Sequence, residues 1–177
     1  MIKILAIPGS LRENSSSNYI LKAIVSVAPD DVRVEVYEGV GTLPHFNDPE
    51  EMPAAVIDFR EKLKQSDAVL ICTPEYAFGI PGSLKNALDW TVASGDFVGK
   101  PVGLVTASSQ GEKGHAALLL VLMAISASVV EDATLLIPFV RSKLDKTGNV
   151  KDNSLLEQLR LLVRNLANAS VKNSNNI

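Results

Sequence analysis

The chain has 177 residues, of which 46% are hydrophobic and 21% charged, and its formal net charge is -3. This composition is typical of one globular domain with a full core, and the charge gives no electrostatic reason to expect nucleic acid or a membrane surface as a partner. The single cysteine excludes an internal disulfide and suits a reducing compartment, and the two histidines offer little for a metal site. We therefore expect a cytoplasmic protein without a metal centre.

Short apolar runs alternate with helical patterns along the whole chain. Strands are predicted at 2–7, 32–36, 67–72, 102–106 and within 129–137. Helices are predicted at 17–28, around 52–63, from 82 onward, at 115–127 and over 155–166. We expect a single domain over 1–169, followed by a polar, disordered tail at 170–177.

This alternation predicts an α/β protein with a doubly wound parallel sheet, covered by helices on both faces. Rossmann-like and flavodoxin-like strand orders are both compatible with the periodicity. Five βα units favour the second, a flavodoxin-like three-layer sandwich with a five-stranded sheet of order 2-1-3-4-5.

One apolar run, at 116–130, is too short to span a bilayer. Its central part, 118–125, is apolar on all sides of the predicted helix, which indicates either a fully buried helix or a subunit contact. We favour the contact, because so small a sheet has little room to bury every side of one helix.

Three loops follow the carboxyl ends of strands that are neighbours in the predicted order, at 9–18, 73–82 and 107–114. Such loops converge on one crevice, where open α/β sheets bind ligands. The first loop offers a guanidinium, several hydroxyls and a helix N-terminus, which are the groups that hold a phosphate monoester. The same serines can instead simply cap the helix. The dinucleotide and nucleoside triphosphate fingerprints are both missing from the sequence, which favours one terminal phosphate over a pyrophosphate.

Several residues near these loops have structural interpretations. Cys72 ends a buried strand, where packing is its expected role. For His115 we favour packing at a helix start over catalysis. Lys85 and Asp89 are spaced to pair on one helix surface, and Trp90 is expected in the core or at a subunit interface.

Four segments together resemble the NADPH-dependent FMN reductase family, which includes quinone, chromate and azo-dye reductases of flavodoxin-like fold. They are Gly9-Ser10-Leu11-Arg12, Pro74-Glu75-Tyr76, the block from Pro81 to Trp90, and Lys143-Leu144-Asp145. The resemblance covers nearly the whole chain. It implies non-covalent FMN, NADPH or NADH as electron donor, a small-molecule electron acceptor, and a homodimer or homotetramer.

The resemblance also implies a set of cofactor contacts. The phosphate would be held by Ser10, Arg12, Ser17 and Asn18. The isoalloxazine would be lined, largely through backbone groups, by Pro74, Glu75, Tyr76, Ala77 and Phe78. The pyrimidine side would be closed by Ser108, Ser109 and Gly111. The chain departs from the pattern at Ala77, where many members have Asn, and at Gly79, where Ser is frequent.

The implied function is NAD(P)H-dependent reduction of quinones, flavins, chromate or azo compounds by a ping-pong mechanism. Hydride passes through N5 of FMN, so the resemblance names no catalytic side chain. Two alternatives stay open: a flavodoxin-like electron carrier, which Arg12 and the modest net charge disfavour, and a non-catalytic flavin-binding module.

Overall fold

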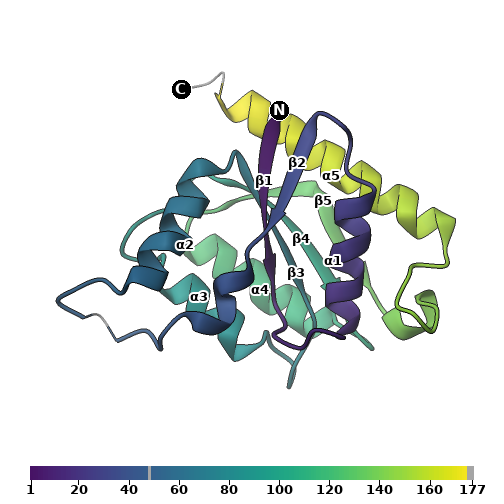
Figure 1. Cartoon of the computed structure of the whole chain (residues 1–177), viewed down its shortest axis with the longest axis horizontal. Coiled ribbons are helices and arrows are strands. Elements are labelled where there is room, and N and C mark those ends of the chain that lie inside the picture. The colour runs from purple at the N-terminus through teal and green to yellow at the C-terminus, as the bar shows by residue number, and fades with distance from the viewer. Residues whose placement is uncertain (48, 175–177) are drawn as a thin grey trace.

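The computed structural model describes residues 1–47 and 49–174 (Figure 1). In this part of the chain, strands alternate with α-helices, and two short 3-10 helices (η1 and η2) lie in the connections. In chain order the elements are β1 Ile2–Pro8, α1 Ser16–Ser26, β2 Val32–Val36, η1 Glu38–Thr42, α2 Ala54–Gln65, β3 Ala68–Thr73, α3 Gly82–Asp89, β4 Pro101–Ala107, α4 Glu112–Ala124, β5 Ser128–Ile137, η2 Val140–Lys143 and α5 Asn153–Ser174.

The strands form one parallel sheet of order β2-β1-β3-β4-β5, which confirms the predicted flavodoxin-like topology. At their carboxyl ends the central strands are in register: Pro8 is opposite Cys72, and Thr73 is opposite Thr106. The loops that leave β1, β3 and β4 therefore start next to one another along the same edge of the sheet.

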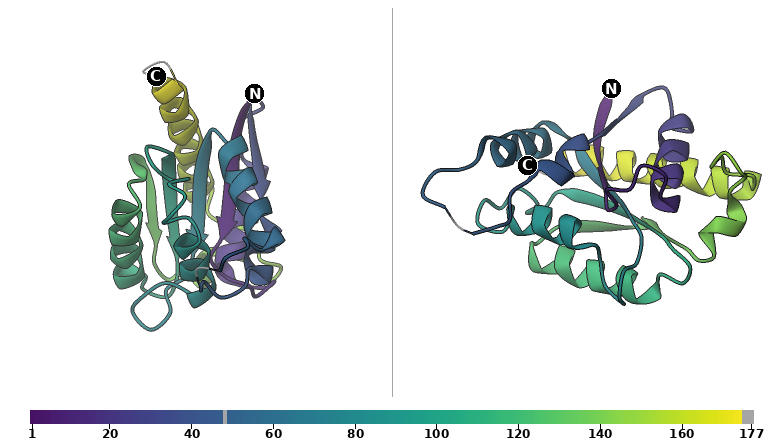
Figure 2. Two further views of the ribbon diagram at one scale, coloured as in Figure 1. Left: turned by 90° about the vertical axis from the view of Figure 1, so that its left-hand side faces the viewer. Right: turned by 60° about the horizontal axis from the view of Figure 1, so that its bottom comes forward.

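Helices cover both faces of the sheet, as Figure 2 shows. Alternate residues of β1 point to opposite faces, because side chains alternate along a strand. Ile4 and Ala6 pack in one core with α1 and α5, whereas Leu5 and Ile7 pack in a second core with α2, α3 and α4. The central strands β3 and β4 are buried along their whole length, as expected for parallel strands covered on both faces.

The last helix is longer than predicted. α5 continues to Ser174, so the expectation of a tail was wrong for 170–174, while 175–177 lie outside the described residues. Ser170 is buried, and its hydroxyl donates a hydrogen bond to the carbonyl of Ala167 at 2.7 Å. Because a serine can satisfy its hydroxyl within the helix in this way, the polar composition of this segment does not end it.

Trp90 is a core residue. Its side chain is 3% exposed, and its indole N–H donates to the carbonyl of Pro44 at 2.8 Å. The ring of Phe46 meets it edge-on with centroids 5.1 Å apart. Trp90 therefore fastens the segment before α2 to the end of α3. On the surface of α3, Lys85 and Asp89 form the predicted ion pair.

Among the described residues, no helix is both long enough and apolar enough to cross a membrane. In the same part of the chain, no three His, Cys, Asp or Glu side chains come together as a possible metal site.

Candidate functional site

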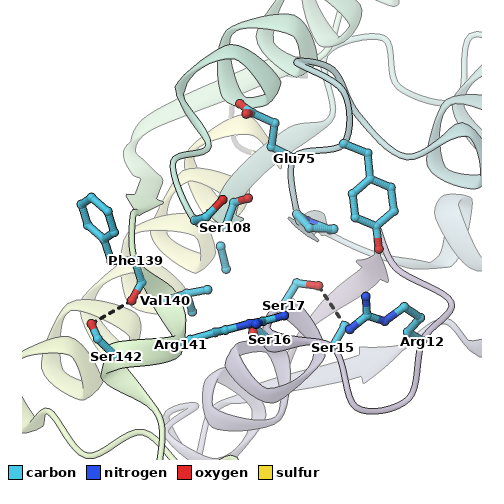
Figure 3. Close-up of a pocket in the computed structure, with 14 residues that line it drawn as sticks. Arg12, Ser15, Ser16, Ser17, Glu75, Ser108, Phe139, Val140, Arg141 and Ser142 are labelled. Carbon is cyan, nitrogen blue, oxygen red and sulfur yellow. Dashed lines mark hydrogen bonds between the residues drawn. The ribbon is translucent and has the colours of Figure 1, made fainter.

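The loops at the carboxyl edge of the sheet surround a cavity of about 570 Å³, a size common for small-molecule sites. Figure 3 shows that its labelled residues come from several separate segments of the chain. The lining residues are Arg12, Ser15, Ser16, Ser17, Pro74, Glu75, Tyr76, Ala107, Ser108, Ser109, Phe139, Val140, Arg141 and Ser142.

The start of α1 forms one end of the cavity. Ser15 caps this helix, because its hydroxyl oxygen accepts a hydrogen bond from the amide of Asn18 at 3.2 Å. The amides of Ser16 and Ser17 have no acceptor among the described residues, as is usual for the first turn of a helix. The capping role and the anion-binding role thus fall to different serines. Ser15 caps, and the next two residues leave N–H groups for a ligand.

Two of the four expected phosphate residues, Arg12 and Ser17, line the cavity, whereas Ser10 and Asn18 brace the loop outside its lining. The hydroxyl of Ser10 accepts from the amide of Arg12 at 3.3 Å, and the side-chain amide of Asn18 donates to the carbonyl of Arg12 at 2.8 Å. The backbone of Arg12 is therefore held on both sides, while its side chain is exposed toward a ligand.

A tight turn follows β3. Tyr76 and Gly79 exchange backbone hydrogen bonds of 3.0 and 2.9 Å, and the two residues between them, Ala77 and Phe78, have φ angles of 47° and 61°. Positive φ at both central positions is the type I′ pattern, which asparagine tolerates better than alanine. This gives a physical reason for the Asn that many family members carry at position 77. Ala77 and Phe78 form the exposed tip of the turn, and neither is part of the cavity lining.

Glu75 joins the second loop to the third. Its carboxylate accepts a hydrogen bond from the amide of Gly114 at 2.7 Å, in the first turn of α4, where a negative charge is favourable. A Cβ atom at Gly114 would lie 2.9 Å from the carbonyl oxygen of Gly79 and 3.0 Å from Cβ of Glu75. The contact therefore requires glycine at position 114.

Gly111 supports the third loop from outside the cavity lining. Its φ of 97° places it in the left-handed region at the start of α4, and a Cβ there would lie 2.8 Å from the Leu136 side chain. Ser108 and Ser109, by contrast, line the cavity.

A fourth segment, at 139–142, lines the cavity and was not among the expected site residues. The amide of Phe139 donates to the carbonyl of Ser109 at 3.0 Å, and that of Val140 donates to Ser108 at 3.1 Å. The predicted strand order could have indicated this segment, because β5 is adjacent to β4 and its carboxyl end lies at the same edge of the sheet.

Cys72 lies beneath the start of α1. Its thiol is fully buried and donates to the carbonyl of Ser17 at 3.2 Å, and burial raises its pKa to about 12. The thiol is therefore protonated at neutral pH, which confirms the predicted packing role.

His115 lies in the first turns of α4, half-buried and outside the cavity lining. Its Nδ1 is 2.9 Å from the hydroxyl of Thr106, and burial lowers the pKa of the imidazole. These contacts support the structural interpretation of this residue, since its ring nitrogen is engaged with the end of β4.

The lowered pKa of His115 predicts a loss of stability in mild acid. The unfolded chain, whose histidines have pKa values of about 6.5, binds more protons than the folded chain just below that pH. The stabilising contribution of neutral His115 is thus complete above about pH 6.5 and is lost as the pH falls toward the folded pKa. We expect the drop in Tm between about pH 7.5 and about pH 5.5 to be smaller in His115→Gln than in the wild type. Thermal unfolding followed by circular dichroism measures it. The exposed His45 supplies the control variant His45→Gln, and an identical pH dependence in all three proteins would contradict the prediction.

Comparison with known proteins identifies the family. The family model for NADPH-dependent FMN reductase matches residues 2–141. The chain is 31% identical to the quinone reductase of Escherichia coli K12 over 169 residues, which cover 89% of each protein. It is 30% identical to the NAD(P)H-dependent FMN reductase PA1204 of Pseudomonas aeruginosa, over 93% of this chain and 97% of that one. In structure it is similar to the flavoenzyme NAD(P)H:(acceptor) oxidoreductase FerB of Paracoccus denitrificans, with a TM-score of 0.86, 25% identity, and coverage of 97% and 98%.

The chain belongs to the NADPH-dependent FMN reductase family. The resemblance seen in the motifs is thereby confirmed, and the protein is an oxidoreductase that uses FMN and NAD(P)H.

The residues of this FMN reductase family member fit the cofactor. One end of the cavity presents cationic and hydroxyl side chains beside unpaired helix amides, a donor set suited to a phosphate monoester. Of the other walls, the segment from Ala107 to Ser109 has only small side chains, which leave room for a flat ring, and the segment from Pro74 to Tyr76 adds the exposed ring of Tyr76.

Proposed function

We propose that this chain is an NAD(P)H-dependent quinone reductase that holds FMN non-covalently in the cavity at the carboxyl edge of its sheet. The observation that carries the proposal is that one cavity combines the unpaired amides of α1 with the walls formed after β3 and β4. The quinone reductase from Escherichia coli supports the choice of acceptor.

Each wall has its own task in this proposal. Arg12 and the amides of Ser16 and Ser17 bind the phosphate, and the segment from Pro74 to Tyr76 holds one edge of the isoalloxazine. Ser108 and Ser109 close the pyrimidine side. When bound, FMN supplies the hydride chemistry, and the side chains of the cavity supply position and charge. The Glu75 carboxylate acts through Gly114 to keep the second and third loops together.

The mouth of the cavity suits a planar acceptor. Tyr76 is 44% exposed and Phe139 is 68% exposed, so aromatic surface is available on two sides for stacking. NAD(P)H and the quinone would use this mouth in turn, in a ping-pong reaction. Flavins are acceptors that the relative from Pseudomonas aeruginosa also supports. Chromate and azo compounds stay predictions, as does the cytoplasmic location.

The spectrum of the purified protein tests this function. We expect a flavin absorption that bleaches with NADPH or NADH and returns on addition of a quinone. Slow bleaching by NAD(P)H would instead favour the electron carrier, and bound FMN without turnover of any acceptor would favour the non-catalytic module. A protein that cannot be loaded with FMN would contradict all three.

We also propose a homodimer formed through the outer face of α4. Leu118 and Leu122 face the core, whereas Leu120 and Met123 are 63% and 67% exposed. Figure 2 shows this helix along the outside of the molecule. A helix that is apolar on its outer face as well as its inner one is typical of a subunit contact.

Charges on this face are expected to prevent association. The double variant Leu120→Glu/Met123→Glu should elute as a monomer, because two carboxylates cannot be buried without partners. Size-exclusion chromatography with light scattering measures the mass. Leu161→Glu, at a residue of α5 that is 59% exposed, is the matched control and should keep the mass of the wild type. An unchanged mass in the double variant would place the contact elsewhere.

A further inference from the structure

A second cationic side chain, Arg141, lines the same cavity as Arg12. Figure 3 shows it extending from η2 to the start of α1, beside Ser16 and Ser17, while Arg12 reaches the same helix start next to Ser15. Neither guanidinium has an ion-pair partner among the described residues. Two unpaired cations therefore approach the free amides of α1 from different directions.

The segment that carries Arg141 is anchored by its neighbours. Val140 is 2% exposed within the core shared by α1 and α5, and its amide is bonded to Ser108. The amide and the hydroxyl of Ser142 both donate to the carbonyl of Phe139, at 2.9 and 2.8 Å. Lys143 pairs with Asp152 at 3.2 Å. Because the backbone on both sides of Arg141 is fixed, holding its side chain against a ligand costs less conformational entropy than it would on a free loop.

The chain continues from η2 into a turn that packs on α1. A Cβ atom at Gly148 would lie 2.3 Å from the ring of Tyr19, so the turn and the helix are in direct contact. The segment that carries Arg141 therefore leads directly into a turn that contacts α1.

The positively and negatively charged residues of the cavity lie in different parts of it. Arg12 and Arg141 lie at the α1 end, and the one carboxylate of the lining, Glu75, is engaged with the amide of Gly114. A phosphate monoester carries about 1.5 to 2 negative charges at pH 7. One guanidinium balances only part of that charge, whereas two match it, and both can form charge-assisted hydrogen bonds.

We infer that Arg141 is a second phosphate-binding residue, which acts with Arg12 to select phosphorylated flavin over riboflavin. The inference rests on the proposed function, because it assumes that the cavity binds FMN. It assigns a cofactor contact to the loop after β5, outside the three loops in which the family resemblance placed the cofactor contacts.

The test compares FMN with riboflavin, which has the same ring and ribityl chain without the phosphate. Titration of the flavin-free protein, followed by flavin fluorescence, gives Kd for both ligands. We expect Arg141→Gln to weaken FMN binding by about 10-fold and to leave riboflavin binding unchanged. Arg141→Lys keeps the charge but not the planar guanidinium, so its affinity for FMN should lie between those of Arg141→Gln and the wild type. Lys146→Gln removes an equal charge from an exposed residue outside the cavity lining and should bind FMN like the wild type.

The outcomes separate the inference from the function on which it rests. If Arg141→Gln binds FMN as tightly as the wild type, or loses both flavins equally, Arg141 is not a phosphate ligand and the proposed function stands. If the wild type binds neither flavin, the inference and the proposed function are both wrong. Arg141-dependent binding of FMN without oxidation of NAD(P)H would support the inference and contradict the proposed function.

Discussion

Replacing Arg12 with alanine is expected to weaken FMN binding by about 1–3 kcal/mol, which is roughly 5- to 150-fold in Kd. The guanidinium lies at the α1 end of the cavity without an ion-pair partner among the described residues, so its charge is available to the phosphate. Because the side chain is exposed, its removal leaves the core intact, and the free energy of unfolding of the flavin-free protein should change little. Fluorescence titration with FMN measures the effect.

Two further variants make this result specific. Arg12→Lys should recover part of the affinity through its charge, although it cannot form the planar, two-pronged contact of arginine. Lys22→Ala removes an exposed cation from α1 outside the cavity lining and should leave FMN binding unchanged. Equal affinity in Arg12→Ala and the wild type would mean that the phosphate is bound elsewhere.

Gly9→Ala is expected to have the largest effect on stability, a loss of about 3 kcal/mol in the free energy of unfolding. A Cβ atom at position 9 would lie 2.2 Å from Oγ1 of Thr73, 2.4 Å from its Cβ and 2.8 Å from its Cα. Thr73 cannot move aside, because it is fully buried at the end of β3 and its hydroxyl is bonded to the carbonyl of Pro74. The amide of Gly9 is itself bonded to Cys72 at 2.8 Å, so the first loop is held against β3.

The matched control is Gly82→Ala. A Cβ atom at this first residue of α3 would have no heavy atom of the described residues within 4 Å, apart from its chain neighbours and the nearby backbone of its own helix. Alanine there should raise stability by about 0.5–1 kcal/mol, since it restricts the unfolded chain. Urea unfolding of both variants gives the comparison. A Gly9→Ala protein as stable as the wild type would show that β1 and β3 can separate at this edge without cost.

The sequence alone determined the fold and the family. Short apolar runs predict the strands, and apolar residues at helical spacing predict the helices. Their alternation predicts a parallel sheet, which is the sheet that the structure has. The Pro74-Glu75-Tyr76 motif and the block that ends at Trp90 are contiguous, so a family resemblance can be read from them without knowledge of tertiary contacts. The prediction that loops after β1, β3 and β4 meet also follows from strand order, which is a property of the whole pattern.

Tertiary structure decided which side chains of those loops reach the cavity. Ser10 and Asn18 were expected to contact the phosphate, yet they are bonded to the backbone of Arg12 and brace the loop. Ala77 and Phe78 follow the motif residues, but their positive φ angles turn them outward. In each case the direction of a side chain depends on local backbone angles and on hydrogen bonds within the loop, neither of which leaves a pattern in composition or periodicity.

The same reason explains Arg141. In the sequence it is one cation among 17 basic residues. It reaches the cavity only because β5 lies next to β4 and because the segment after β5 packs near α1, with Val140 in the core and Gly148 against the ring of Tyr19. Contacts between segments more than a hundred residues apart are set by the packing of the whole domain. Sequence patterns therefore predicted the edge of the sheet where the cavity lies, and only the folded structure placed a second arginine there.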